Sequence, residues 1–232
     1  MSYPIHNNMV ELCQELVNEK QITSQRVYDV VVNIDRADFI QTRPYQNRAQ
    51  PIPCNVVISA PHLHGYCLEN LKDYLTEGSN VLDIGFGSGL FTLYMSKMMN
   101  DKGCVVGIEH MEKLCELGKT NISKHNKDLL DNKKIILIKG DGRLGYKEKA
   151  PYKCIHVGAV SKEPPKALLE QLAIGGRLLI PLGTNDNNQY IHFIDRFGED
   201  DYRDSIGWSV NYVALTSVND QLKKSDWLLL IK

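Results

Sequence analysis

The segment VLDIGFGSGLF, residues 81–91, decides the fold because it joins a short apolar strand to a helix through three glycines. Gly85, Gly87 and Gly89 permit a tight turn and the close approach of a ligand to bare backbone, and the helix start adds unpaired N–H donors. The dinucleotide fingerprint does not fit, because the third glycine comes one residue early and Leu90 takes its place. No Gly-Lys-Ser/Thr follows, so this is not a P-loop either. The segment therefore predicts a strand, a ligand-binding turn and a helix.

From residue 80 onward, short apolar strands alternate with segments of helical periodicity. Continuous apolar strands joined by helical crossovers are typical of a parallel sheet that helices cover on both faces. Three later β-like runs would extend this sheet with antiparallel strands. We therefore expect an α/β fold with a doubly wound, mostly parallel sheet. The expected strands are 80–84, 104–108, 134–138, 154–157 and 177–181, the expected helices 89–99, 111–125 and 164–173, and the later runs 190–197, 208–216 and 227–232.

The N-terminal third has a different rhythm. Apolar residues recur at helical spacing in 9–17 and again in 27–34, and Ser24 precedes the second pattern as the expected N-cap. The stretch 42–54 holds three prolines and several polar residues, which predicts a long loop that serves binding rather than simple connection. We expect a helical N-terminal region with a substrate-side loop at 1–78. A cofactor-binding core with C-terminal strands would occupy 79–232.

The composition is that of an ordinary globular protein. Hydrophobic residues make up 43% of the 232 residues, and 27 Lys and Arg against 28 Asp and Glu leave a formal net charge of -1. This balance gives no general attraction to nucleic acid or to anionic membranes. We see no signal peptide and no apolar run of about 18 residues, the length of a membrane span. The six cysteines are scattered without a C-x-x-C pair, so we expect free thiols in a cytoplasmic protein.

Acidic residues follow three of the expected strands. Asp83 would repel a phosphate at the glycine turn and suits a cationic ligand, such as the ammonium or sulfonium group of S-adenosylmethionine. Glu109, twenty residues after Gly89, is placed to accept hydrogen bonds from both ribose hydroxyls, and Asp141 could take an adenine amino group. The three acids together predict a site for a nucleoside joined to methionine.

The segment VISAPHLHGY, residues 57–66, holds two histidines behind a proline. Pro61 fits the first position of a helix, which places His62 and His64 about 200° apart around the axis. They cannot chelate one metal together, so we expect no metal site. Ser59 stands at or near the helix cap, where its hydroxyl and nearby backbone N–H groups could hold an anion. The alternative is that Ser59 is an ordinary cap and His64 a packing residue.

Motifs spread over most of the chain carry a family resemblance. They are DRADFI, ISAPHLHGY, LDIGFGSG, GIEHMEKL, GDGRLGY, APYKCIHVGAV, LAIGGRLLIPLG and VALT. With them the chain resembles the protein-L-isoaspartate (D-aspartate) O-methyltransferase family, whose fold is Rossmann-like. Three residues depart from the family pattern. Phe86 replaces a small residue in the glycine turn and is expected to crowd or reshape it, Lys153 replaces an acid, and Ala214 replaces a proline in the segment that resembles the peptide-docking strand.

The resemblance implies methyl transfer from S-adenosyl-L-methionine to the free α-carboxylate of L-isoaspartyl and D-aspartyl residues in damaged peptides and proteins, with S-adenosyl-L-homocysteine as product. The ester would close to a succinimide that hydrolyses partly to normal aspartate. Residues 1–78 and 212–216 would form the peptide cleft of a monomer. The resemblance assigns Ser59 as the catalytic serine, cofactor contacts to Ile58, Ala60, Pro61, His64, Asp83, Gly85, Phe86, Gly87, Gly89, Glu109, His110, Asp141, Gly142 and Thr216, and substrate contacts to Ser59, Val213, Ala214 and Leu215.

Two alternatives remain open from the sequence. One is a methyltransferase of the same fold that acts on a small molecule or RNA, although the near-neutral charge and the SAPHLH segment disfavour RNA. The other is a non-catalytic module that keeps only the cofactor fold. The presence of Ser59, Asp83, Glu109 and Asp141 speaks against such a module, whereas Phe86 in the turn keeps it open.

Overall fold

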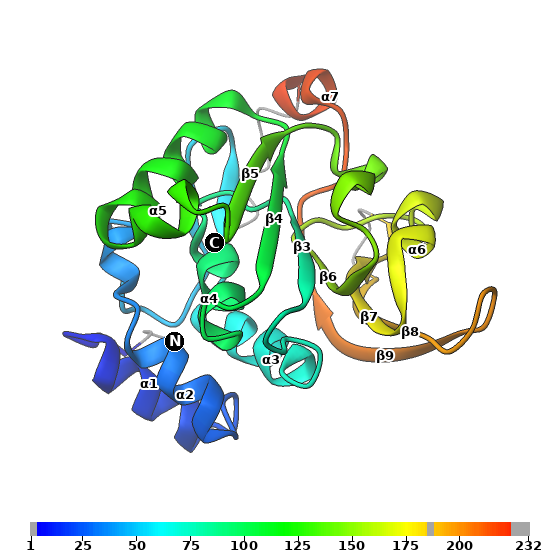
Figure 1. The fold of residues 1–232 in the computed structure, drawn as a ribbon. Coiled ribbons are helices and arrows are strands. Elements are labelled where there is room, and N and C mark those ends of the chain that lie inside the picture. Colours follow the sequence, from blue (N-terminus) through cyan, green and yellow to red (C-terminus); the bar gives the residue numbers. More distant parts are fainter. Residues whose placement is uncertain (1–3, 185–187, 224–232) are drawn as a thin grey trace.

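A seven-stranded sheet forms the centre of the computed structural model, which describes residues 4–184 and 188–223 (Figure 1). The strand order is β5-β4-β3-β6-β7-β8-β9. The first five of these strands are parallel and the last two antiparallel, which confirms the predicted fold class. The strands are β3 Asn80–Ile84, β4 Cys104–Glu109, β5 Ile135–Lys139, β6 Tyr152–Val157, β7 Leu172–Leu182, β8 Gln189–Arg196 and β9 Tyr202–Val210.

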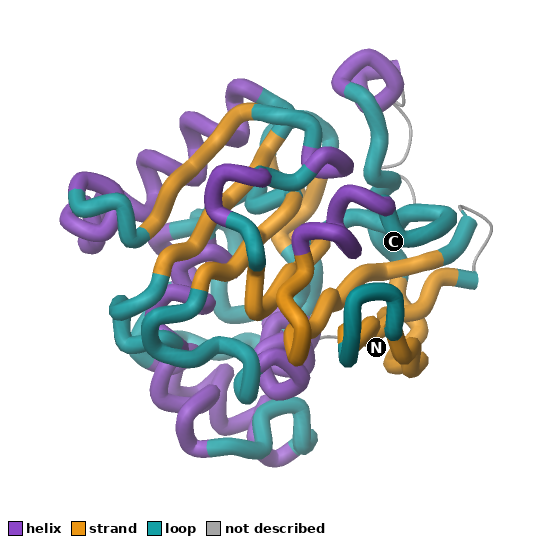
Figure 2. The backbone as a smooth tube through the Cα atoms, turned by 45° about the vertical axis from the view of Figure 1, so that its right-hand side comes forward, coloured by secondary structure: helices purple, strands orange, loops and turns teal. Residues whose placement is uncertain are grey.

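Helices cover both faces of this sheet (Figure 2). Successive side chains of a strand point to opposite faces, so Val81 joins the core beneath α1 to α5 while Leu82 joins the core beneath α6. The helices are α1 Met9–Asn18, α2 Gln25–Val32, α3 Pro61–Leu71, α4 Leu90–Met98, α5 Glu112–Asp131, α6 Lys166–Gln171 and α7 Val218–Lys223, with the 3₁₀ turns η1 Arg36–Asp38, η2 Gly142–Leu144 and η3 Lys147–Lys149.

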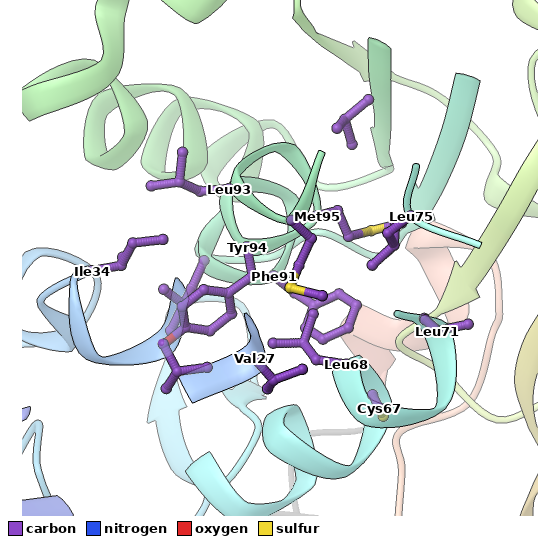
Figure 3. Close-up of a cluster of buried hydrophobic side chains, with 14 of the residues drawn as sticks. Val27, Ile34, Cys67, Leu68, Leu71, Leu75, Phe91, Leu93, Tyr94 and Met95 are labelled. Atoms are coloured by element: carbon purple, nitrogen blue, oxygen red, sulfur yellow. The ribbon is translucent and has the colours of Figure 1, made fainter. Parts of the chain in front are cut away.

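The N-terminal helices share one apolar core with the sheet. Val27 of α2, Leu68 of α3 and Leu93 of α4 belong to the same buried cluster (Figure 3). Arg26 of α2 adds hydrogen bonds to this packing, because its guanidinium donates to the backbone carbonyl groups of Lys72, Leu75 and Met98. The helices α1, α2 and α3 therefore pack as a layer on one face of the sheet.

Two stretches differ from the sequence expectation. Within the proline-rich stretch expected as a loop, β1 Gln50–Ile52 pairs antiparallel with β2 Val56–Ile58, because proline is tolerated in a strand that has a neighbour on one side only. The expected strand at 208–216 ends early at Val210. Beyond it, Ala214 forms only an isolated parallel bridge with Val160.

Smaller differences concern helix ends and the C-terminus. Ser24 does precede α2, but its side chain makes no cap bond and instead donates to Glu69 Oε1 at 3.0 Å. The expected strand at 227–232 lies outside the described residues. Across 4–184 and 188–223, no helix is both long and apolar enough to cross a membrane. All six cysteines are free thiols.

Candidate active site

The glycine turn after β3 adopts a conformation that only glycine takes easily. Gly85, Gly87 and Gly89 have φ angles of +76°, +50° and +85°, in the left-handed region. Gly89 is also the residue that caps α4. A β-carbon at Gly89 would lie 3.1 Å from the carbonyl oxygen of Gly118 on α5. The three glycines are thus required by backbone shape, as the sequence indicates.

Two adjoining hollows open at the carboxyl ends of the parallel strands. We call the first the inner pocket; it is bounded by the glycine turn, the ends of β4 and η2, and the segment 213–216. We call the second the outer cleft; it has a volume of about 670 Å³ and lies between β2, the start of α3 and the end of β9. The hollows share Val57, Gly158 and Val213 in their walls. A ligand in one can therefore meet a ligand in the other.

The hollows bring together most of the site residues expected from the sequence. Ser59 and Ala60 line the outer cleft. The segment expected to contact substrate, Val213 to Leu215, instead lines the inner pocket, and only Val213 borders both. The inner pocket also gathers Gly85, Gly87, Glu109, His110, Gly142 and Thr216, whereas Ile58, Pro61, His64, Asp83, Phe86, Gly89 and Asp141 line neither hollow.

Glu109 provides the carboxylate of the inner pocket. Its side chain is 6% exposed. The backbone N–H groups of His110 and Met111 donate to Oε1 at 2.7 and 3.0 Å, and that of Gly87 donates to Oε2 at 3.3 Å. Burial raises the pKa of Glu109 above its usual 4.5. These donors fix the carboxylate at the end of β4, where it can accept two hydroxyl groups of a ligand.

Asp83 has a different role from the one expected. Its side chain is 1% exposed and accepts a hydrogen bond from Thr92 Oγ1 at 2.6 Å. Its other oxygen lies 2.8 Å from His156 Nδ1. The strand turns this side chain onto the face that α4 covers, so the carboxylate joins β3, β6 and α4 rather than facing a cationic ligand.

Asp141 lies at the same edge of the sheet but does not line the inner pocket. Its carboxylate accepts from the backbone N–H of Arg143 at 3.0 Å and pairs with the Arg143 guanidinium at 2.7 Å. The guanidinium lowers the pKa of Asp141. The next residue, Gly142, lines the inner pocket instead of Asp141. The strand-end argument finds the right edge of the sheet but not the pairing of Asp141 with Arg143.

The two histidines lie on different sides of α3, as helix geometry requires. The His64 ring is buried, with ring centroids 5.4 Å from Phe91 and 5.9 Å from Tyr94, and burial lowers the pKa of His64 well below 6.5. His64 is therefore a neutral packing residue. His62 borders the outer cleft, and its ring Nδ1 lies 2.8 Å from Asn47 Oδ1. No group of three His, Cys, Asp or Glu among the described residues is arranged to hold a metal ion.

Phe86 does not crowd the inner pocket. The residue is buried behind the turn, between β4 and α5. A β-carbon added at Gly107 would lie 3.0 Å from its ring, and one added at Gly118 would lie 2.7 Å from it. Two glycines thus make room for the ring, so the expectation that Phe86 crowds the turn is wrong.

Ser59 comes one residue before the helix cap. Ala60 is the N-cap of α3 and makes no side-chain cap bond. The Ser59 side chain interacts with the phenol of Tyr212, whose pKa burial raises well above 10. The Ser59 carbonyl oxygen accepts a hydrogen bond from Arg36 Nη2 at 2.8 Å. These contacts disfavour the alternative that Ser59 is an ordinary cap, because its side chain interacts with Tyr212 and the residue lines the outer cleft.

Sequence reasoning missed several lining residues. Trp208 borders the outer cleft and stacks on Tyr66 with ring centroids 3.9 Å apart. Gln221 of α7 borders the inner pocket, with Oε1 at 2.6 Å from His110 Nε2, and donates to the Cys54 carbonyl at 3.2 Å. No local pattern marks these residues, since their neighbours at the site lie far away in the chain.

The family comparison agrees with the geometry. A family model described as protein-L-isoaspartate(D-aspartate) O-methyltransferase matches residues 7–220. A protein-L-isoaspartate O-methyltransferase of Caenorhabditis elegans is 45% identical over 215 residues, which cover 93% of this chain and 95% of the relative. One of Triticum aestivum is 41% identical over 207 residues, covering 88% and 89% of the two chains.

Solved structures point the same way. A Plasmodium falciparum structure, described as a protein-L-isoaspartate O-methyltransferase in complex with S-adenosyl-L-homocysteine, superposes with a TM-score of 0.85 at 29% identity. The match covers 91% of this chain and 99% of that one. A second structure with the same enzyme name has a TM-score of 0.75 at 24% identity, which supports the fold alone. The chain therefore belongs to the protein-L-isoaspartate (D-aspartate) O-methyltransferase family.

Proposed function

We propose that this protein transfers the methyl group of S-adenosyl-L-methionine to the free α-carboxylate of L-isoaspartyl and D-aspartyl residues in damaged peptides and proteins. The observation that carries the proposal is the pair of hollows that meet at Val57, Gly158 and Val213. The inner pocket offers a glycine turn and Glu109, and the outer cleft offers Ser59. A cofactor and a peptide bound in these places would have their reacting groups side by side.

The inner pocket fits the cofactor chemically. Its glycine backbone allows close approach, and Glu109 is held so that two oxygens can accept the ribose hydroxyls. Gln221 supplies an amide close to His110 on the same wall. When bound, S-adenosyl-L-methionine supplies an electrophilic methyl group on its sulfonium, and S-adenosyl-L-homocysteine is the product.

The protein orients a carboxylate that is already a nucleophile at neutral pH. A strong general base is not required, and His64 is buried and neutral outside both hollows. The Ser59 hydroxyl would donate to the substrate carboxylate and hold its oxygen in line for attack, which is catalysis by proximity and preorganisation. The methyl ester leaves the site, and the neighbouring backbone amide nitrogen attacks it to close a succinimide and release methanol. Water then opens the succinimide partly to L-aspartate without further help.

The outer cleft, at about 670 Å³, falls within the range of pockets that take ligands of drug size or larger. It suits a short, extended peptide segment rather than a folded surface. The near-neutral formal charge of -1 supports protein rather than nucleic acid as substrate. We place the enzyme in the cytoplasm, in keeping with the free cysteines, and we propose that it acts as a monomer.

Methyl transfer to two otherwise identical peptides, one with isoaspartate and one with aspartate, tests the proposal. We expect transfer to the isoaspartyl peptide only.

The role of Ser59 is tested by substitution. Losing one oriented donor lowers a rate by roughly 10²–10³-fold, and for Ser59→Ala we expect a loss of kcat at the lower end of this range, because backbone donors remain. Ser59→Thr should fall between wild type and Ser59→Ala. A thermal melt controls for folding: a lower Tm with wild-type kcat would leave Ser59 a purely structural residue.

A further inference from the structure

Arg36 carries a buried cation directly beneath Ser59. The residue is 1% exposed and lies in η1, within the DRADFI motif. Its Nη2 donates to the Ser59 carbonyl oxygen at 2.8 Å. Its Nε and Nη1 have no hydrogen-bond partner in the described part of the chain. Buried polar groups without partners are rare in proteins, so a buried guanidinium that makes only one hydrogen bond is unusual.

The charge of Arg36 is not balanced by its neighbours. Burial lowers the pKa of Arg36 to about 10, so it stays protonated at neutral pH. The adjacent His64 is neutral, and burial keeps the phenol of Tyr94 neutral as well. The carboxylate of Asp35 instead accepts from the Ala37 N–H and the Tyr45 hydroxyl. A buried charge without a carboxylate partner costs stability, so stability alone does not account for Arg36.

The bond to Arg36 also sets the direction of the next N–H group. In a planar trans peptide the C=O and N–H groups point to opposite sides. The Ser59 carbonyl points at Arg36, so the Ala60 N–H points away from it, on the peptide that lines the outer cleft. This N–H donates no hydrogen bond within the described residues. It also stands at the start of α3, where the helix dipole favours anions.

We propose that Arg36 is a positioning residue that turns the Ser59–Ala60 peptide into a cradle for the substrate carboxylate. The Ala60 N–H and the Ser59 hydroxyl donate to the carboxylate, and the unpaired guanidinium behind them supplies positive potential. This inference rests on the proposed function, since it assigns the anion to the isoaspartyl α-carboxylate. The cofactor binds in the inner pocket, so Arg36 acts on the peptide and not on the cofactor.

The test compares Arg36→Met, which removes charge and donor, with Arg36→Lys, which keeps the charge. Arg26→Met is the matched control, because Arg26 donates to three backbone carbonyls away from the site. We expect Arg36→Met to raise KM for an isoaspartyl peptide by about 10- to 150-fold, the range for losing the hydrogen bond from the Ala60 N–H, which Arg36 orients, to the charged carboxylate. S-adenosyl-L-homocysteine affinity, measured by calorimetry, should stay within about twofold, and Arg36→Lys should recover part of the loss. Arg26→Met should lower Tm and leave KM unchanged.

A wild-type KM in Arg36→Met with a lower Tm would overturn the proposal and make Arg36 structural. An equal loss of S-adenosyl-L-homocysteine affinity would also overturn it, since the effect would then reach the whole site. If Arg36→Met does not fold, Arg36→Lys decides: a raised KM with unchanged cofactor affinity supports the cradle, and a wild-type KM contradicts it. Wild-type enzyme that methylates no isoaspartyl peptide would instead contradict the proposed function itself.

Discussion

Glu109 and Asp83 stand at the ends of neighbouring strands, yet their carboxylates have different surroundings. Three backbone N–H groups hold Glu109 at the inner pocket, whereas Thr92 and His156 hold Asp83 inside the core. The sequence shows that both acids end a strand. It does not show the pairing of Asp83 with His156, which lies 73 residues further along the chain. The place of a residue at the sheet edge is therefore predictable, and the direction of its side chain is not.

Glu109→Gln tests the carboxylate of the inner pocket. The two ribose hydroxyls can both donate to the Glu109 carboxylate only when it is ionised. Because the pKa of Glu109 is raised above 4.5, lowering the pH should begin to weaken wild-type affinity for S-adenosyl-L-homocysteine while the pH is still above 4.5. Glu109→Gln should bind about 1.5–3 kcal/mol more weakly at neutral pH, with a flatter pH dependence. Calorimetry between pH 5 and 8 measures both. An equally steep profile in the variant would assign the titration to another group.

At the scale of elements, Phe86 shows how a large side chain is accommodated in a glycine turn. The ring fills the space between β4 and α5 that Gly107 and Gly118 leave free. The sequence shows the large residue but not the two glycines opposite it, because they lie on other elements. The β1–β2 hairpin escapes prediction for a related reason. Its two strands are three residues each, so they depend on their mutual pairing and on the packing of Ile58 in the core.

Because Phe86 packs closely against α5, we expect a Gly→Ala substitution in this helix to lower the stability of the protein, whereas such a substitution usually raises it. Gly→Ala within a helix usually stabilises by about 1 kcal/mol. In α5 the new β-carbon of Gly118→Ala would lie 2.7 Å from the Phe86 ring, so we expect a loss of about 1–3 kcal/mol from overpacking. In a Phe86→Ala background only the Gly87 carbonyl oxygen, 3.2 Å from the new β-carbon, still crowds it, so most of the loss should disappear. Denaturant unfolding of the four proteins forms a double-mutant cycle. Equal effects of Gly118→Ala in both backgrounds would show that the ring is not its obstacle.

At the scale of the molecule, the boundary expected near residue 78 does not divide the core. The parallel sheet was predictable because its strands are apolar throughout and alternate with helices. The way in which α1 and α2 pack on it was not, since their amphipathic patterns show that one face is buried but not against what. In the structure, Leu12, Val27 and Leu68 lie in one cluster with Val81 and Val105 of the sheet. Arg26 joins the same layers through backbone carbonyls.

This shared core predicts that cofactor binding stabilises the N-terminal helices as much as the sheet. Saturation with S-adenosyl-L-homocysteine at about 100 times its Kd adds about 2.7 kcal/mol to global stability. Amides of α2 and of β3 that exchange only through global unfolding should therefore slow together, by roughly 100-fold. Native-state hydrogen exchange with and without the ligand measures this. Glu109→Gln at the same ligand concentration is the control, and its smaller protection should again be equal in both elements. Protection of β3 without α2 would show that residues 1–78 unfold as a separate domain.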